Sequence, residues 1–156
     1  MSVAAKLKEC LDGNKVKYDV LTHPQVYTAQ AVAAATHVPG KELAKSVVVK
    51  ADDHFVLAVL PAPRKVDTEQ FQKQLGAKEV RLAHEFEFAS LFPACETGAM
   101  PPFGNLYGMD VYVDRSITRD EEIVFNAGTH VEAIRMNYKD FERLVAPTVA
   151  DFSTAA

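Results

Sequence analysis

Two glycines and two prolines fall within the seven residues Gly98-Ala99-Met100-Pro101-Pro102-Phe103-Gly104. No helix or strand can run through this stretch, because proline fixes φ, lacks an amide proton and pushes the residue before it towards extended conformations. Glycine adds φ values that other residues avoid. The stretch therefore predicts a stiff loop, which is either an ordinary turn between two core elements or the preformed wall of a binding site.

The chain has 156 residues, so we expect residues 1–156 to form one domain with a substantial core. There is no run of about 18 apolar residues to span a membrane, and the first six residues lack the apolar core of a signal peptide. We therefore expect a cytoplasmic protein without membrane contact. Cys10 and Cys95 have no metal-type spacing and are expected to be free thiols.

The net charge of −4 argues against a non-specific nucleic-acid binder. The charge is uneven, with nine Lys and Arg against six Asp and Glu in residues 1–65, and eight against fifteen in the rest. The asymmetry is either a small basic face on the N-terminal half or a chance feature of a solvated surface.

Hydrophobic periodicity, turn residues and capping residues predict interspersed helices and strands. The expected helices are 2–12 (capped by Ser2), 29–36 (capped by Thr28), 68–76 (capped by Asp67), 84–92 and 138–145 (capped by Asn137). The expected strands are 16–21, 45–50, 54–60, 79–82, 107–113, 122–126 and 130–135, and the chain from Pro147 is expected to be a short tail. Strands 45–50 and 54–60 are expected to form a hairpin. This irregular order indicates an α+β or mixed α/β fold around one sheet and not a doubly wound fold.

Lys45 opens a valine-rich strand, and its ammonium must reach water or a charged partner because an unpaired buried charge is costly. One interpretation is an anion or carbonyl contact at the mouth of a pocket. The other is a lysine at a strand end whose stem packs while its head stays in water.

The stretch Phe125-Asn126-Ala127-Gly128-Thr129-His130 collects short polar residues where a strand pattern breaks. Such a break can aim backbone N–H groups and polar side chains into a cavity. His130 is a candidate base, a candidate hydrogen-bond donor to a substrate, or a histidine satisfied within the core.

Several common chemistries have no motif here. There is no Gly-x-Ser-x-Gly nucleophile elbow and no Gly-x-x-x-x-Gly-Lys phosphate loop. The five histidines lack metal-site spacing, and nothing in the local sequence supplies the base that a nucleophilic Cys95 would need. We therefore expect no metal and no cofactor, and a structural role for Cys95.

Three elements together carry a family resemblance: Lys45 at the head of its strand, the loop 98–104, and the stretch 125–130. In their order and spacing they resemble the YbaK/ProX family of prolyl-tRNA editing domains, over nearly the whole chain. Within that family the Pro-Pro-Phe loop is similar to the free-standing, alanine-specific branch called ProXp-ala, whereas the cysteine-specific YbaK branch usually has Ser-Pro there.

The resemblance implies a single α/β domain with a mixed, barrel-like sheet flanked by helices. It implies a trans-acting deacylase that hydrolyses the ester of Ala-tRNA(Pro) and spares Pro-tRNA(Pro). The implied partner is the alanine-charged acceptor end of tRNA(Pro), with prolyl-tRNA synthetase as a further candidate partner and a monomer as the default state. The competing interpretations are a deacylase for Cys-, Ser- or Thr-charged tRNA, and a non-catalytic module that binds the aminoacyl-tRNA end.

The resemblance also assigns roles to residues. Lys45 is the key functional residue, the bend at Gly128 offers backbone groups, and His130 is a positioner before it is a base. The expected substrate-binding residues are Gly98, Met100, Pro101, Pro102, Phe103, Gly104, Asn126, Ala127 and Thr129. The expected tRNA contacts are basic residues of the N-terminal half, namely Lys41, Lys50, Arg64 and Lys65.

Overall fold

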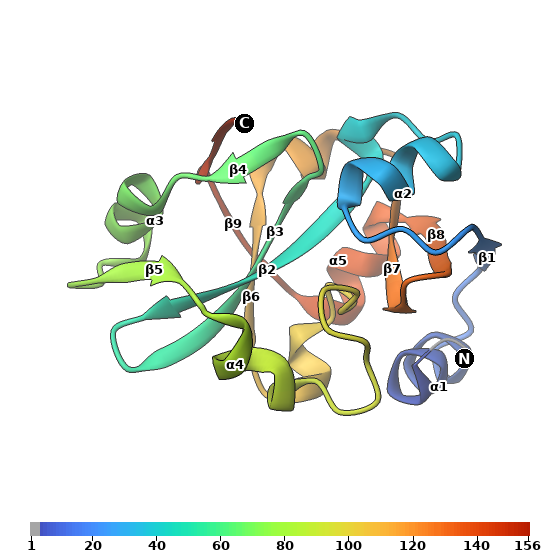
Figure 1. Cartoon of the computed structure of the whole chain (residues 1–156), viewed down its shortest axis with the longest axis horizontal. Helices are drawn as coiled ribbons and strands as arrows, with labels where there is room; N and C mark the ends of the chain where they lie inside the picture. The colour runs from blue at the N-terminus through green and yellow to red at the C-terminus, as the bar shows by residue number, and fades with distance from the viewer. Residues whose placement is uncertain (1–3) are drawn as a thin grey trace.

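Three groups of strands, flanked by short helices, make up the computed structural model, which describes residues 4–156 (Figure 1). A five-stranded sheet has the order β5-β2-β3-β6-β9, a three-stranded sheet has the order β1-β8-β7, and β10 pairs with β4. The strands are β1 (Tyr18–Thr22), β2 (Ala44–Ala51), β3 (His54–Pro61), β4 (Arg64–Val66), β5 (Val80–Leu82), β6 (Asp110–Asp114), β7 (Glu122–Thr129), β8 (Glu132–Asn137), β9 (Thr148–Ala150) and β10 (Ser153–Ala155). The α-helices are α1 (Ala5–Gly13), α2 (Ala29–Ala35), α3 (Thr68–Leu75), α4 (Glu85–Phe88) and α5 (Tyr138–Val145), and the 3₁₀ turns are η1 (Gly40–Glu42), η2 (Ala89–Leu91), η3 (Gly104–Tyr107) and η4 (Arg115–Arg119).

The five-stranded sheet is built on the β2–β3 hairpin, whose strands pair antiparallel along their full length from Ala44 opposite Pro61 to Ala51 opposite His54. β5 adds to β2 antiparallel, whereas β6 joins β3 in parallel and β9 joins β6 in parallel. The sheet is therefore mixed, as the family resemblance implied.

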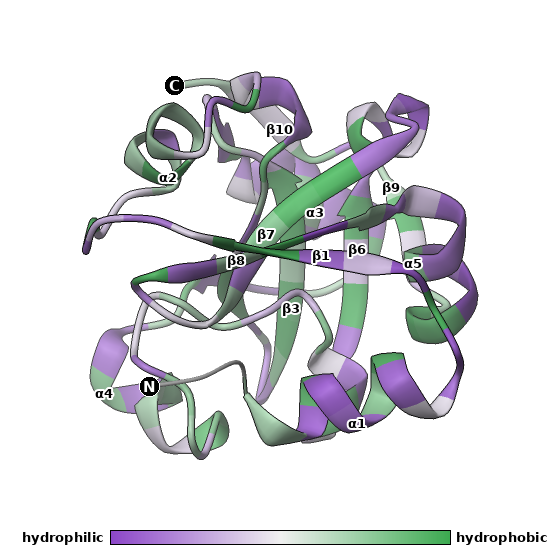
Figure 2. Ribbon diagram, turned by 90° about the vertical axis from the view of Figure 1, so that its right-hand side faces the viewer, coloured by the Kyte–Doolittle hydropathy of each residue, from purple (hydrophilic) through white to green (hydrophobic). Residues whose placement is uncertain are grey.

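The two larger sheets meet where β2 begins. Leu43, directly before β2, forms a parallel bridge with Val124 of β7. Beyond this point the strands of the two sheets cross steeply (Figure 2). One face of β7 contributes Phe125 and Ala127 to the main core, and Val124 on the other face packs in a smaller core with Leu43 and residues of α2.

Most of the expected elements are confirmed. Thr28 caps α2 by accepting a hydrogen bond from the Ala31 N–H at 3.0 Å, and Asp67 caps α3 in the same way. α3 ends at Gly76 in the left-handed conformation, and α5 spans the predicted 138–145. The predicted cap Ser2 lies outside the described residues, and α1 begins at Ala5. The mixed α/β class is confirmed, with the strands in separate sheets that do not close into a barrel.

Several boundaries differ from the sequence prediction. β6 begins only at Asp110, because residues 104–107 form the turn η3. β7 does not stop at Asn126 but continues to Thr129 through a register shift, so the predicted break is a β-bulge, and the following strand begins at Glu132. The tail after Pro147 forms β9 and β10, and β10 pairs with the unpredicted β4.

The C-terminal strands are fixed by the buried carboxylate of Asp114. One of its oxygens accepts from the N–H groups of Phe152 at 3.2 Å and Ser153 at 3.1 Å, and the other accepts from the N–H and hydroxyl of Ser116. Burial alone would raise the pKa of Asp114, but these hydrogen bonds outweigh it and hold the pKa below its usual value.

We predict that Asp114→Asn lowers the free energy of unfolding at pH 7 by about 2 kcal/mol, because hydrogen bonds to a charged acceptor are the strong ones. The folded pKa is depressed, so this stabilisation is present above the unfolded pKa of about 3.9 and is lost as pH falls through the folded value. Denaturant melts at pH 7 and pH 3 measure both effects. Asp53→Asn, at a fully exposed side chain, is the control and should change little. An Asp114→Asn deficit of equal size at both pH values would contradict the assignment.

Candidate functional site

The bulge in β7 and the loop that precedes η3 are joined through backbone groups of Gly128. Its N–H donates to the carbonyl of Ala99 at 2.9 Å, and its carbonyl accepts from the N–H of Glu96 at 2.8 Å. Gly128 has φ +100°, and a Cβ there would lie 2.9 Å from the Cβ of Ala4. Only glycine fits this position, because both the conformation and the space exclude a side chain. The bulge therefore fixes residues 96–99 against the sheet.

His130 connects the same loop to the turn after β7. Its backbone N–H donates to Glu96 Oε1 at 3.1 Å, and its ring Nε2 lies 3.0 Å from the carbonyl oxygen of Thr97. A carbonyl only accepts, so Nε2 carries the proton and Nδ1 is left as the acceptor in the neutral ring. The exposed ring of Tyr27 stands edge-on to this imidazole with centroids 4.8 Å apart. His130 thus holds the loop in place, which is the arrangement of a positioning residue.

Within the loop 98–104, only Gly98 is exposed. Gly98 has φ +91°, and a Cβ there would meet His130 Cε1 at 3.5 Å. Its N–H points at Met100 Sδ at 3.1 Å, so Met100 folds back towards the glycine. Pro101 and Pro102 are buried and keep the backbone rigid. The exposed end of the loop is therefore its first residue, beside His130.

Phe103 and Gly104 require a correction as substrate contacts. Phe103 is fully buried, with its ring 5.6 Å from that of Phe125 and 5.5 Å from that of Phe141. A Cβ on Gly104 would lie 3.0 Å from a methyl of Val111. Both residues face the main core, because the loop turns inwards after Pro102. Their role in this structure is to anchor the loop.

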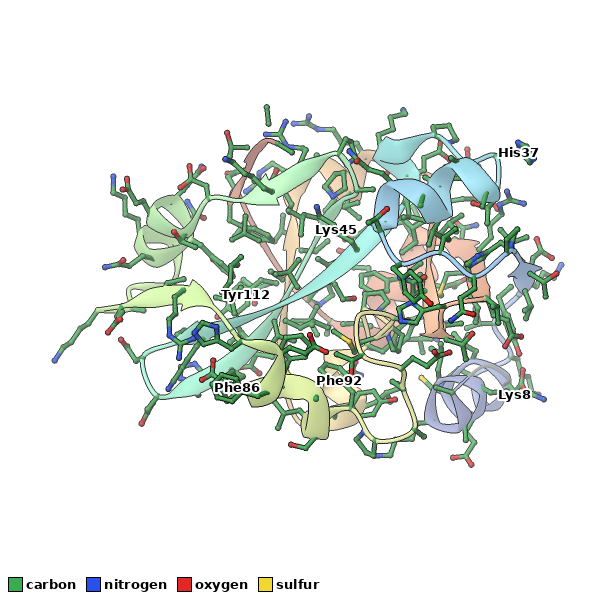
Figure 3. All side chains as sticks on the ribbon, viewed as in Figure 1. Lys8, His37, Lys45, Phe86, Phe92 and Tyr112 are labelled. Carbon is green, nitrogen blue, oxygen red and sulfur yellow. The ribbon has the colours of Figure 1, made fainter. Side chains whose placement is uncertain are left out.

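Lys45 lies on the part of β2 next to α2 (Figure 3). Its ammonium donates to the carbonyl oxygen of Ala62 at 3.1 Å, and partial burial lowers the pKa of the lysine. An ammonium has three N–H donors, so two remain for another acceptor. Because Leu43 and Val124 are bridged in parallel, Lys45 and Asn126 follow two residues later on the same side of their strands.

Asn126 supplies an unused acceptor in this region. Its side-chain Oδ1 is buried and has no hydrogen-bond partner among the described residues, and the same is true of the hydroxyl of Ser46. Buried polar atoms without partners are rare in native structures and call for an explanation, and a bound ligand is one. Ala127 and Thr129 are fully buried, and the Ala127 carbonyl accepts from the N–H of Ala4 at 2.9 Å.

Sequence reasoning missed four residues around this site: His23, Tyr27, Glu96 and Thr97. His23 is buried, its Nε2 has no partner within residues 4–156, and its N–H donates to the carbonyl of Val131 at 2.9 Å. A histidine followed by proline at the end of a predicted strand was the available signal. Glu96 and Thr97 gave none, because their contacts are more than thirty residues away in the chain.

The expected tRNA contacts separate into two places. Lys41 and Arg64 lie on η1 and β4, which meet where a Cβ on Gly40 would be 3.5 Å from Pro63, and Lys65 follows Arg64. Lys50 lies towards the other end of β2, with its ammonium 6.0 Å from the ring of Phe55. The structure therefore brings three of the four residues together.

Two further features limit the chemistry of the site. Burial raises the pKa of the Cys95 thiol, which lies 3.4 Å from the Tyr107 hydroxyl, so a reactive thiolate is disfavoured. In residues 4–156 no three His, Cys, Asp or Glu side chains gather as a metal ion would require.

A recess of about 690 Å³ lies apart from the residues above, between β1, β8 and α5. The helices of the described region include none long and apolar enough to cross a membrane.

A half-buried lysine, a backbone bulge and a rigid loop, without an activated nucleophile among the described residues, suit a hydrolase of already activated substrates. The chain belongs to the aminoacyl-tRNA editing domain family, whose model matches residues 23–144. The expected enzyme class, an aminoacyl-tRNA deacylase, is confirmed at the level of this family.

Similar proteins agree with this assignment. The multifunctional Ser/Thr-tRNA deacylase ProXp-y of Escherichia coli K12 is 28% identical over 144 residues, covering 89% of this chain and 86% of that protein. The proline–tRNA ligase of Gloeobacter violaceus is 28% identical over 145 residues, which are 88% of this chain but 24% of the ligase. A solved structure described as a candidate trans-editing enzyme for prolyl-tRNA synthetase superposes with a TM-score of 0.82 at 21% identity, covering 97% of both chains.

We predict that Gly128→Ala lowers the free energy of unfolding by about 1–3 kcal/mol, because alanine would be strained at φ +100° and would collide with Ala4. For a chain of this size that is a fall of roughly 3–10 °C in melting temperature. Gly13→Ala is the matched control, since nothing lies within 4 Å of a Cβ in that helical position. Equal melting temperatures for Gly128→Ala and the wild type would show that the bulge does not need glycine.

Proposed function

We propose that residues 1–156 form one editing domain that hydrolyses the ester between a small amino acid and the 3′ end of tRNA(Pro), with alanine as the principal substrate. The observation that supports this most directly is the position of Lys45. Its half-buried ammonium donates to a single carbonyl, and Asn126, which like Lys45 follows the Leu43–Val124 bridge by two residues, has an amide oxygen without a partner among the described residues. Such a pair offers donors for a phosphate or ester oxygen and an acceptor for an α-ammonium group.

The reaction needs little from the protein besides orientation. An aminoacyl ester is already activated, so a water molecule attacks the carbonyl carbon, the ester C–O bond breaks, and the ribose hydroxyl leaves with a proton. Rigid donors aimed at the developing oxyanion and a fixed substrate are sufficient to accelerate this step. We assign Lys45 to the terminal phosphate or the substrate carbonyl, Gly128 and its neighbours to the bulge that shapes the pocket, and His130 to holding the loop.

The limit on amino-acid size is assigned to the start of the loop 98–104. Gly98 lies beside His130, the sulfur of the buried Met100 accepts from the Gly98 N–H, and Pro101 and Pro102 prevent the backbone from yielding. A rigid wall excludes a larger side chain by collision, whereas an apolar pocket discriminates poorly against a smaller one. This asymmetry suits an enzyme that must remove alanine from tRNA(Pro) and spare proline.

Serine or threonine is the second candidate substrate. The unpaired Oδ1 of Asn126 is a polar group that an amino acid with a hydroxyl would satisfy. The deacylase from Escherichia coli carries Ser/Thr in its name. In both cases the chemistry at the ester is the same, and only the group inside the pocket differs.

The decisive test is a deacylation panel with tRNA(Pro) charged with alanine, serine, threonine, cysteine or proline. We expect the fastest release of alanine and no acceleration for proline. Faster release of serine or threonine would replace the alanine assignment. Tight binding of a non-hydrolysable alanyl-adenosine analogue, with no turnover of any ester, would identify a binding module and overturn the enzyme.

Lys45→Ala should reduce deacylation by at least about 100-fold, because the oriented charge at the ester or terminal phosphate is lost. The melting temperature should be unchanged or slightly higher, since a partly desolvated ammonium is removed. Lys73→Ala, at an exposed lysine of α3, is the control and should retain full activity. A Lys45→Ala protein with wild-type kcat/KM would exclude this lysine from the site.

Met100→Ala should relax the size limit and allow measurable hydrolysis of Pro-tRNA(Pro), because it removes the side chain that folds back on Gly98. Met100→Leu conserves the volume and is the matched control. The ratio of kcat/KM for the alanyl and prolyl esters is the measurement, with thermal melts to confirm that both variants are folded. If proline remains excluded in a folded Met100→Ala protein, another residue sets the limit.

A further inference from the structure

A second recess, of about 280 Å³, opens where β4, η4 and the C-terminal strands meet, and its seven lining residues are Arg64, Asp114, Arg115, Ser116, Arg119, Asp151 and Ser153. The three arginines come from segments some fifty residues apart in the chain. We infer that this recess binds a backbone phosphate of the tRNA acceptor arm while the aminoacyl end occupies the site at Lys45. The inference rests on the proposed function, which supplies the RNA.

The guanidinium of Arg64 is already oriented for contact with a phosphate. Its Nε donates to Ser153 Oγ at 2.6 Å and its Nη2 to the Ser153 carbonyl at 2.9 Å. These two bonds orient the planar guanidinium and leave its Nη1 without a partner among the described residues. A donor group fixed in advance loses little conformational entropy when it binds an anion.

Arg115 and Arg119 supply the remaining donors from the exposed face of η4. Arg115 uses Nε to contact Asp151 at 3.1 Å, and both of its Nη groups are unpaired within residues 4–156. The side chain of Arg119 has no hydrogen bond or ion pair in the described part of the chain. Guanidinium groups bind phosphate through paired N–H groups, and a recess of this size suits one phosphate better than a base or a peptide segment.

The two carboxylates of the recess do not cancel this charge at its mouth. Both oxygens of Asp114 are occupied by N–H and hydroxyl groups of Ser116, Phe152 and Ser153. Asp151 is paired with Arg115. Both oxygens of Asp114 and Oδ1 of Asp151 are thus engaged within the protein, the three arginines of the recess outnumber its two aspartates, and the unused hydrogen-bonding groups of the arginines are all donors.

The position of the recess also fits a nucleic-acid strand that leads away from the ester. Arg64 lies two residues after Ala62, whose carbonyl accepts from Lys45. Lys41 and Lys65 flank Arg64 on η1 and β4. Lys45, Lys41, Lys65 and the three arginines are carried by β2, η1, β4 and η4, which meet at the Pro61 end of β3.

The larger recess between β1, β8 and α5 is the weaker candidate. It has four cations, but Asp19, Glu122 and Asp140 line it as well. The carboxylates of these three residues accept no hydrogen bond from a backbone N–H group of the described residues. Asp140 pairs with Arg143 at 3.3 Å. Arg143 therefore provides a matched control, because it is an exposed arginine that lines this other recess and is paired with Asp140.

The test compares the double variant Arg115→Gln/Arg119→Gln with Arg143→Gln in binding to uncharged tRNA(Pro) across a salt series. We expect the double variant to bind on the order of 10-fold more weakly near 100 mM salt, with a slope of log K against log salt reduced by about 1. Arg143→Gln should match the wild type. Wild-type affinity and slope in the double variant would overturn the inference. So would a loss of affinity for inorganic phosphate with no change in RNA binding, which would mark a site for free anions.

A second measurement separates this inference from the proposed function. With 3′-alanyl-adenosine, an ester without phosphates, the double variant should hydrolyse at the wild-type rate, whereas its KM for alanyl-tRNA should rise about 10-fold with kcat unchanged. Equal losses on both substrates would contradict a phosphate site. If the wild type hydrolyses neither ester, the proposed function fails, and the binding comparison still decides whether the arginines contact RNA.

Discussion

The backbone pairing between Gly128 and the loop is the constraint on which the site depends. Two hydrogen bonds, to the Ala99 carbonyl and from the Glu96 N–H, connect the β7 bulge to a segment with no regular structure of its own. They form only if residue 128 adopts φ +100° and has no side chain. The glycine thus sets the position of Gly98, and through it the spacing between the loop and His130. The prolines that follow make this position rigid, because the loop cannot relax by rotating about φ.

Lys45, on the other sheet, is the residue proposed to contact the ligand, and its environment is suited to that role. An ammonium out of water loses several kcal/mol of hydration unless partners replace it. The Ala62 carbonyl is one partner, and the lowered pKa shows that the compensation is incomplete. An incoming phosphate or carbonyl oxygen would recover part of this loss. The meeting of β2 and β7 at Leu43 and Val124 is therefore both a packing contact and the reason that Lys45 and Asn126 share one side.

Local signals predicted the parts of the fold that local chemistry determines. The caps at Thr28 and Asp67 were correct because a side-chain oxygen three residues before a free N–H acts within one turn. The strands β4, β9 and β10 escaped prediction, because each has three residues and exists only through partners elsewhere in the chain. The stretch 125–130 was recognised as irregular, but its form as a bulge depends on the loop. The inward turn at Phe103 was likewise invisible, because the rings of Phe125 and Phe141 decide it.

An acidic protein can bind RNA if its cationic side chains cluster on one surface and its carboxylates there are paired within the protein. The total charge of −4 does not reveal such a cluster. The carboxylate of Asp114 lines the same recess as Arg64, and its oxygens accept hydrogen bonds from internal donors. It keeps its charge, and Asp151 is paired with Arg115, so the attraction for a phosphate comes from the excess of three arginines over two aspartates. The hydrogen bonds to Asp114 fix Ser153 of β10, and Ser153 in turn orients the guanidinium of Arg64. Stability of the C-terminal strands and the orientation of Arg64 therefore depend on the same buried group.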